Sequence, residues 1–271
     1  MRRMTELLTD PDAVRAALVD DTYRMPAVDT AATNGIAWLR AAVARFCDGA
    51  PHARRRALAT DLLDTIDPDE LHVRARDRTR TILADEDGPV EVMSAVARPV
   101  PVGVLSAALG VGSDLTPAVA AAASSYQPHA TADTAADAAV AELVTAFGAT
   151  ADEPTAARIG LLVQACDATA GLIGTAILAG SVDAALRDDP PVRRTRRVHN
   201  GHEVHLDITG APFGAGPHRC PGREHALALA TGVLAALEDW RIRPEPVGHE
   251  PSPALRIPAK ILMTSHSVTS P

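Results

Sequence analysis

The cysteine at position 220 stands in the stretch of this sequence whose residue types and spacing best suit chemistry. It closes a glycine-rich segment, FGAGPHRCPG from Phe213 to Gly222, and a run with helix-forming composition follows. Backbone N–H groups in a tight loop and at a helix start carry positive partial charge, which stabilises a thiolate. Gly214 and Gly216 allow the tight turns that such a loop needs. This presentation suits axial ligation of a haem iron, and a structural cysteine in an ordinary turn is the alternative.

The spacing inside this segment matches a known pattern. The segment resembles the haem-binding loop of cytochrome P450 enzymes, FGxGxHxCxG, and the matching positions are Phe213, Gly214, Gly216, His218, Cys220 and Gly222. Six matches at fixed spacing are a far more specific signal than a lone glycine motif. The resemblance implies haem b as the cofactor, with the sulfur of Cys220 as the ligand of its iron.

Haem carries two propionates, and segments outside this loop offer cations for them. Arginine suits a carboxylate because its planar guanidinium donates two parallel hydrogen bonds. His52 and Arg56 stand one helical turn apart in PHARRRALA and can therefore face one propionate, as the family's HxxxR does. Arg197 and His218 resemble the other propionate contacts of the family. We expect the remaining arginines of these segments to be solvated surface residues: Arg54, Arg55, Arg193, Arg194 and Arg196.

A long apolar run, 159–180, resembles the central helix that crosses the distal face of the haem in this family. Typical members carry an acid and an adjacent alcohol there, which deliver protons during oxygen activation. Asp167 matches the acid, but Ala168 stands at the alcohol position. Thr169 lies one residue further on, about 100° around the helix.

We take Gln164, Asp167 and Thr169 as the candidate catalytic groups of the distal side, with Asp167 as the proton donor. Gln164 either faces the haem pocket as a hydrogen-bonding group or is satisfied by a neighbouring helix. Removal of a proton-delivering hydroxyl usually slows such chemistry by orders of magnitude. Ala168 therefore favours atypical haem chemistry over reductive oxygenation, although water or a substrate hydroxyl can substitute for the missing group.

The elements that must position these residues are predicted to be mainly helices. Capping residues followed by proline at Asp10-Pro11 and Asp67-Pro68 predict helix starts. Thr150 and Glu153 form a capping box for the long helix. Residues 198–209 predict a strand or hairpin, and the proline-rich tail predicts irregular structure with a small hairpin. The other expected helices span residues 34–46, 52–63, 90–109 with a kink at its prolines, 115–125, 131–147, 182–187 and 223–240.

The resemblance covers most of the chain and implies a shortened cytochrome P450-like helical fold, as a single domain over residues 1–271. The strands that usually precede the first helix are expected to be missing. The short stretch between Arg197 and Phe213 leaves little room for the family's strands and meander, and Ala184 replaces the glutamate of its ExxR motif. We therefore predict a truncated, mainly α fold with a much reduced β portion.

The amino-acid composition limits the binding partners and the cellular location that we expect for the protein. A net charge of −8 argues against nucleic acid. Three cysteines that are far apart and form no CxxC exclude a zinc site by their spacing and fit a reducing cytosol. The N-terminus shows no signal peptide pattern, so we expect a cytoplasmic protein. The apolar run 159–180 holds polar residues at its middle and lacks flanking anchors, which favours a buried helix over a membrane span.

These expectations combine into a hypothesis of a haem-thiolate enzyme acting on a small organic molecule in secondary-metabolite biosynthesis. The reaction is either monooxygenation or atypical haem chemistry, such as peroxide-driven oxidation or a redox-neutral rearrangement, dehydration or cyclisation. The alternative is a degenerate haem-binding homologue that acts as a scaffold or activator of a partner pathway enzyme. Relatives of that kind lose the cysteine, which this chain keeps. A ferredoxin-type redox partner fits the first hypothesis, and a truncated core that exposes apolar surface fits a dimer.

Overall fold

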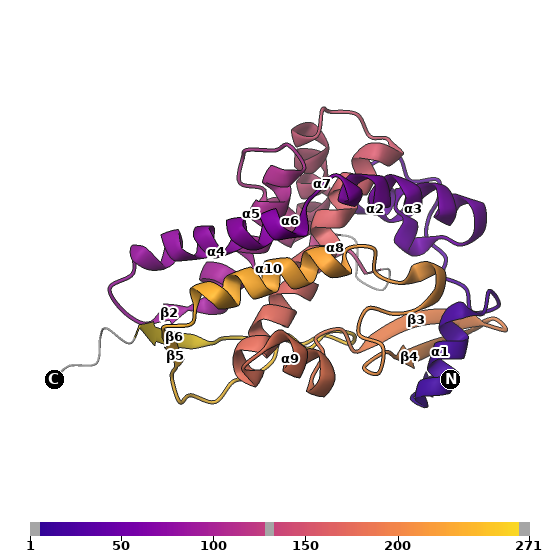
Figure 1. Cartoon of the computed structure of the whole chain (residues 1–271). Helices are drawn as coiled ribbons and strands as arrows, with labels where there is room; N and C mark the ends of the chain where they lie inside the picture. Colours follow the sequence, from indigo (N-terminus) through magenta and orange to yellow (C-terminus); the bar gives the residue numbers. More distant parts are fainter. Residues whose placement is uncertain (1–5, 128–132, 266–271) are drawn as a thin grey trace. The chain divides into compact units, whose positions relative to one another are not determined.

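The computed structural model describes residues 6–127 and 133–265, and helices dominate it (Figure 1). The described residues cluster into two compact units, each assembled from three separated segments. Unit 1 takes its residues from Met1–Thr65, Pro117–Gln164 and Val192–Gly222. Unit 2 takes its residues from Ile66–Thr116, Ala165–Pro191 and Arg223–Pro271. One domain over residues 1–271 stays a prediction.

The elements of unit 1 form a small sheet and a set of helices. Its strands are β1 (Glu6–Leu8), β3 (Arg194–His199) and β4 (His202–Asp207). Its helices are α1 (Pro11–Val19), α2 (Gly35–Ala42), the 3₁₀ turn η1 (Ala44–Phe46), α3 (Gly49–Asp64), α6 (Thr116–Ser124), α7 (Thr134–Ala146), the first part of α8 (Glu153–Ala179) and the 3₁₀ turn η3 (Gly216–His218).

The sheet of unit 1 is built on a β3–β4 hairpin, as the sequence predicts for residues 198–209, although β3 begins earlier. Asn200 and Gly201 close the hairpin with φ values of +50° and +77°, the left-handed conformation that a tight two-residue turn requires. Strand β1 pairs in parallel with β4. The expectation that no strand precedes the first helix is therefore wrong. The pairing partner of β1 lies almost two hundred residues away along the chain, which local sequence patterns do not reveal.

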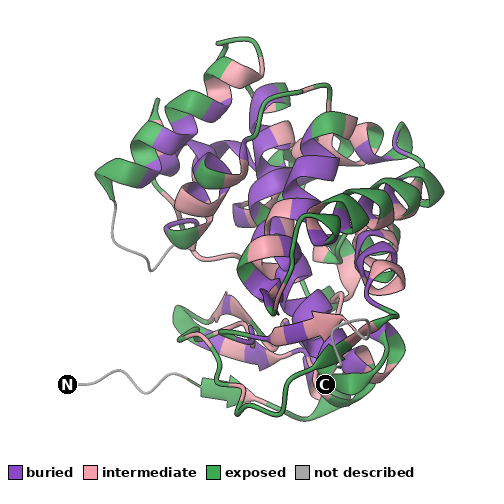
Figure 2. Ribbon diagram, turned by 90° about the vertical axis from the view of Figure 1, so that its left-hand side faces the viewer, coloured by how far each residue is buried: buried purple, intermediate pink, exposed green. Residues whose placement is uncertain are grey.

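The core beneath this sheet follows the alternation of β4. Val204 and Leu206 point to one face and are buried against Val14 and Leu18 of α1. Figure 2 shows this alternation of buried and less buried residues along the strands. Helix α1 thereby packs on the sheet, as its apolar face requires.

The helix starts of unit 1 follow capping signals, with two departures from the sequence expectation. Asp10 caps α1 by accepting the N–H of Ala13 (2.8 Å). Helix α3 begins at Gly49 rather than 52, because Pro51 sits in the first turn, where no N–H is needed. Helix α8 is capped by Asp152, which accepts the N–H of Thr155 (2.8 Å), and not by the predicted capping box of Thr150 and Glu153.

The helix expected over 131–147 is α7, and its first residues fall partly outside the described part of the chain. Asp133 caps α7 by accepting the N–H of Ala135 (3.0 Å). Residues 131 and 132 of the prediction lie outside the described residues.

Unit 2 is mainly helical as well. Its elements are α4 (Pro68–Ala84), β2 (Val90–Glu91), the π-helix η2 (Met93–Ala97), α5 (Pro99–Ala108), the remainder of α8, α9 (Val182–Asp188), α10 (Arg223–Ala236), β5 (Trp240–Ile242) and β6 (Leu262–Ser265). Strand β6 lies between β2 and β5 and is antiparallel to both.

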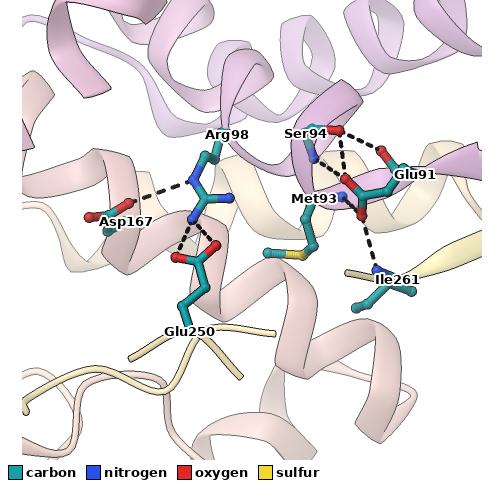
Figure 3. A network of polar contacts seen from close by, with 7 residues as sticks. All are labelled: Glu91, Met93, Ser94, Arg98, Asp167, Glu250 and Ile261. Atoms are coloured by element: carbon teal, nitrogen blue, oxygen red, sulfur yellow. Dashed lines mark hydrogen bonds and ion pairs between the residues drawn. The ribbon is translucent and has the colours of Figure 1, made fainter. Parts of the chain in front are cut away.

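The segment predicted as one kinked helix over 90–109 is divided in the structure. Val90 and Glu91 form β2, because they pair with Met263 and Leu262 of the distant β6. The Glu91 carboxylate then accepts the N–H groups of Met93 (3.1 Å) and Ser94 (2.8 Å) at the start of η2, and that of Ile261 (3.0 Å) (Figure 3). Glu91 therefore fixes both the start of the π-helix and the approach of the C-terminal strand.

Helix α8 is long and apolar enough to cross a membrane by length and composition, and it is the one such helix among the described residues. In its most apolar window 67% of the residues are buried inside the structure. That degree of burial is typical of the core helix of a folded domain, as the sequence predicts.

Helices α4 and α10 lie side by side in unit 2 (Figure 1). Gly232 of α10 makes their close approach possible. A Cβ at this position would lie 2.3 Å from the carbonyl O of His72 and 3.1 Å from Cβ of Ala75. A backbone oxygen cannot move aside without shifting α4, so only glycine fits here.

Gly232→Ala is therefore expected to lower the free energy of unfolding by about 1–3 kcal/mol, because α4 and α10 must separate. The measurement is the urea midpoint followed by circular dichroism. Gly88→Ala is the matched control, since a Cβ there meets nothing within 4 Å. We expect its midpoint to be unchanged or slightly raised. Equal midpoints for both variants would contradict the packing described here.

Candidate functional site

Cys220 ends a compact loop of unit 1 that begins at Phe213. The N–H of Cys220 donates to the carbonyl O of Phe213 (2.8 Å), so the chain between them folds back on itself. Gly214 and Gly216 have φ values of +71° and +66°, where an L side chain would be strained. A Cβ at Gly216 would also lie 2.6 Å from the carbonyl O of Leu18. The glycine spacing therefore sets both the turn of the loop and its close packing on α1.

The thiol of Cys220 is both reachable and partly desolvated. Cys220 is exposed at the surface of the unit. Surrounding protein nevertheless raises the pKa of the thiol by burial, while the N–H of Gly222 and the charges of Arg56 and Arg45 act in the opposite direction. The net shift favours the protonated thiol in this state. A bound metal cation would reverse that balance, because a coordinating thiol loses its proton.

Two histidines that the sequence assigned to one cofactor lie together, one of them in this loop and the other on α3. The ring centroids of His52 on α3 and His218 in η3 are 4.1 Å apart. Nε2 of His218 contacts Oδ1 of Asp48 (3.2 Å), and Oδ2 of Asp48 accepts the N–H of Met25 (2.9 Å). Burial lowers the pKa of His218 to about 4, with His52 and Arg197 contributing, so both rings favour the neutral form.

Arg197 lies on the buried face of the sheet of unit 1. It pairs with Val204 in the hairpin and is 4% exposed. Its Nη1 donates to Oγ1 of Thr195 (2.9 Å) and to the carbonyl O of Arg196 (2.8 Å), both neutral acceptors. Burial, together with the positive charge of Arg45, lowers the pKa of Arg197 to about 10. A buried arginine bonded only to neutral groups is costly unless an anion approaches it.

The other basic side chains near Arg197 are also partly buried and would be stabilised by an anion. Burial lowers the pKa of Arg56, which is half-buried on α3. The Nε atom of Arg45 is buried and has no hydrogen-bond partner among the described residues. Asp48 is the acidic side chain that the structure places in contact with this group. The set of basic side chains is Arg45, His52, Arg56, Arg197 and His218. Their composition fits a cofactor with two carboxylates, and the cysteine fits its metal, so the donor set suits haem.

The candidate proton donor, Asp167, lies in unit 2 and shares an arginine with a second carboxylate (Figure 3). Nη2 of Arg98 contacts both carboxylate oxygens of Glu250 (2.6 and 2.7 Å), while its Nε is 3.7 Å from Oδ1 of Asp167. Burial raises the pKa of Asp167, and the negative charge of Glu250 adds to this, against the opposing charge of Arg98. The raised pKa makes the Asp167 carboxyl easier to protonate than an aspartate in water.

The other two distal candidates lie differently from the expectation. Nε2 of Gln164 donates to the carbonyl O of Gly160 in its own helix (2.8 Å), so no neighbouring helix is needed to satisfy it, and its side chain is exposed. Thr169 is 2% exposed, so its hydroxyl is not on the accessible side of α8. Ala168, at the alcohol position, is half-buried. A pocket role for Gln164 stays a prediction, and burial speaks against one for Thr169.

Sequence reasoning missed four residues of these groups: Arg45, Asp48, Arg98 and Glu250. Asp48 stands four residues before His52, a spacing that could have indicated it. Arg45 lies on a 3₁₀ turn without a recognisable motif. Arg98 and Glu250 are distant from Asp167 in sequence, so only the folded chain brings them together. Of the arginines expected at the surface, Arg54 is exposed and Arg55 is half-buried, and both bind Glu153 (2.8 Å each). In the described segments, no group of three or more His, Cys, Asp or Glu side chains could hold a metal ion.

The low pKa of His218 predicts acid sensitivity of the haem-free protein. The unfolded chain takes up a proton below about pH 6.5, whereas folded His218 does so only near pH 4. The free energy of unfolding should therefore fall as the pH drops through this window, by on the order of 3 kcal/mol from this residue. Urea midpoints between pH 7.5 and pH 4 measure it.

His218→Gln should lose this part of the pH dependence, whereas the control His202→Gln, an exposed position on β4, should keep it. A His218→Gln profile that parallels the parent protein would show that the ring is not the source of the acid sensitivity.

Comparison with solved structures identifies the fold. The thermophilic cytochrome P450 from Sulfolobus tokodaii matches 95% of this chain and 93% of its own, with a TM-score of 0.75 and 18% identity. CxnD, a cytochrome P450 described for C–S bond formation in chuangxinmycin biosynthesis, matches 97% of this chain and 88% of its own (TM-score 0.76, 16% identity). P450BioI, solved with a ligated acyl carrier protein, matches 96% and 92% (TM-score 0.75, 15% identity).

No protein-family model matches the sequence, and no curated protein matches it in sequence comparison. The likeness is therefore carried by the arrangement of the elements. The mainly helical fold class expected from the haem-loop resemblance is confirmed. The chain has the cytochrome P450 fold, in a shortened form.

Proposed function

We propose that this protein is a haem-thiolate enzyme that acts on a small organic molecule, with Cys220 as the ligand of the iron of haem b. The observation that carries the proposal is an accessible cysteine beside a set of desolvated cations that lack matching carboxylates. A cofactor with a thiophilic metal and two carboxylates satisfies both features at once. The cytochrome P450 fold supports this assignment.

In this proposal each candidate haem-binding residue of unit 1 has a defined role. Arg197 would donate to one propionate, and its burial raises the strength of that interaction. Arg56, with His52 one turn earlier on α3, and His218 would donate to propionate oxygens as well. Phe213, Gly214 and Gly222 would shape the loop that presents the sulfur. The N–H of Gly222, which already favours the thiolate, would continue to stabilise it.

Asp167 is the proposed proton carrier on the distal side. When bound, the haem supplies redox or Lewis-acid chemistry at a thiolate-ligated iron. Because Glu250 occupies the Nη2 edge of Arg98, Asp167 keeps only a longer contact with that arginine. Its raised pKa allows its carboxyl to hold a proton and release it toward the reacting molecule. Ala168 offers no hydroxyl to relay that proton.

The reaction class follows from this missing relay. We propose atypical haem chemistry, peroxide-driven or redox-neutral, ahead of ferredoxin-dependent monooxygenation. The substrate class rests on the fold neighbours. CxnD is described for chuangxinmycin biosynthesis, and RauA, another solved cytochrome P450 of similar fold, is complexed with a biosynthetic intermediate of aurachin RE. A cytoplasmic location, a ferredoxin-type partner for any reductive activity and a dimer are further parts of this proposal.

Cys220→Ser tests the ligand. The parent protein loaded with haem, reduced and exposed to carbon monoxide, should absorb at the position typical of thiolate ligation. Cys220→Ser should lose that band, because a hydroxyl is a far weaker donor to iron than a thiolate. Cys47→Ser is the matched control, since Cys47 is a half-buried cysteine of the same unit. An unchanged spectrum for Cys220→Ser would refute the assignment.

Ala168→Thr tests the proton relay. Restoring the hydroxyl beside Asp167 should raise oxygen consumption supported by a ferredoxin and its NAD(P)H-dependent reductase by at least about tenfold. Adding Asp167→Asn to this variant should remove the gain. The control is Ala165→Thr, at another half-buried position of α8, and it should not raise oxygen consumption. A parent protein that already depends strictly on ferredoxin and NAD(P)H, and gains nothing from Ala168→Thr, would contradict the atypical branch.

A further inference from the structure

Arg45 is held in unit 1 without an evident structural partner for its charge. It lies on η1, between α2 and α3, and its guanidinium carbon is 5.7 Å from the ring centroid of Phe46. The Phe46 ring packs in turn against that of Tyr126, with centroids 5.1 Å apart. The Nε atom of Arg45 is buried and has no hydrogen-bond partner among the described residues. The guanidinium thus lies against an aromatic ring while one of its buried N–H donors has no acceptor.

Arg40 and Arg54 of unit 1 differ from Arg45, because their Nε atoms have hydrogen-bond acceptors. Arg40 donates to the main-chain carbonyls of Ser125, Tyr126 and Gln127. Arg54 donates to both carboxylate oxygens of Glu153 (2.9 and 2.8 Å). An unused buried donor costs about 1–3 kcal/mol, so its retention calls for a compensating ligand.

The position of Arg45 shows where that ligand would lie. Its positive charge is one of the causes that lower the pKa of buried Arg197, and it also favours the thiolate form of Cys220. Two partly desolvated guanidinium groups that repel one another are stabilised when an anion joins them. Arg197 itself uses Nη1 on neutral groups, so it too lacks a carboxylate.

We propose that Arg45 and Arg197 together bind one of the two carboxylates of the cofactor, with Nε of Arg45 donating to it. This inference rests on the proposed function, because the carboxylate belongs to haem. A guanidinium that is already held against Phe46 loses little freedom when it binds, so the interaction is preorganised. Arg45 is thus a cofactor-binding residue outside the motifs that the sequence displays.

A titration with two cofactors tests the proposal. The haem-free protein is titrated with haem and with haem dimethyl ester, which lacks both carboxylate charges, and binding is followed by the Soret absorbance. Arg45→Met removes the charge and keeps an unbranched chain for Phe46, and Arg45→Leu serves as a second neutral variant. Arg54→Leu is the control, because Arg54 is bonded to Glu153 in the same unit.

We expect Arg45→Met and Arg45→Leu to bind haem about ten- to a hundredfold more weakly than the parent protein. With the dimethyl ester their affinities should equal that of the parent within about twofold, since the paired carboxylate is gone. Arg54→Leu should match the parent with both cofactors. Equal losses for haem and its ester, or no loss for haem, would overturn the role of Arg45.

Thermal unfolding of the haem-free variants separates binding from structure. If Arg45 serves to bind an anion, its replacement in the haem-free protein should leave the unfolding temperature unchanged or raise it. The reason is that repulsion between Arg45 and Arg197 is relieved. A lower midpoint together with equal losses for the two cofactors would mark Arg45 as structural. If the parent protein forms no Soret-absorbing complex, the proposed function and this inference both fail. Haem binding by the parent with unaltered binding by both variants overturns only the inference.

Discussion

Positive charge that is partly removed from water, and that Asp48 balances only in part, is the constraint on which unit 1 depends. The cations come from separate segments: Arg45 from η1, Arg56 from α3 and Arg197 from β3. Their proximity shows in the lowered pKa values of His218 and Arg197, for which burial is the first cause and neighbouring cations the next. A dianionic ligand would relieve these charges and stabilise the folded state by mass action. Binding of the proposed cofactor would therefore be coupled to folding of this unit.

In unit 2 the group of Arg98, Asp167 and Glu250 has the opposite balance of charge, with one arginine for two carboxylates. Glu250 holds the short contacts to Arg98, and Asp167 holds the longer one. Burial of Asp167 is then only partly compensated, which raises its pKa. The structure thus has an excess of cations in one unit and a carboxyl with a raised pKa in the other. Both properties arise from unequal numbers of opposite charges rather than from any single side chain.

Local signals in the sequence were sufficient for most features that one short segment determines. The exceptions are the start of α3 and the cap of α8. The spacing of FGAGPHRCPG predicted a tight glycine-dependent loop, and the pairing of Asp10 with Pro11 predicted the start of α1. His52 and His218, assigned to one cofactor by resemblance, do lie in ring contact. The larger failures depend on distant partners. Strand β1 forms only because β4 returns to it, and Val90 is extended rather than helical because Met263 pairs with it.

The site residues missed by sequence reasoning share a physical cause. Arg45 is marked only by an unused buried donor, which no pattern of residue types can display. Arg98 matters because it binds Glu250, and the two residues come into contact only in the folded chain. Conversely, Thr169 matched the expected chemistry by type but points into the buried side of α8. Residue type and spacing thus located the cysteine loop and its cations, while burial decided which candidates can act.

The carboxylate of Glu91 has a consequence for how this chain is made. It binds the N–H of Ile261, 170 residues further along, and β2 pairs with the strand that follows. At a synthesis rate of about 5–20 residues per second, the ribosome delivers that partner roughly 10–30 s after Glu91 itself. During this interval the first β-pairing of unit 2 cannot form, and its apolar surfaces stay available to chaperones. Unit 2 must therefore complete its folding late in translation or after it.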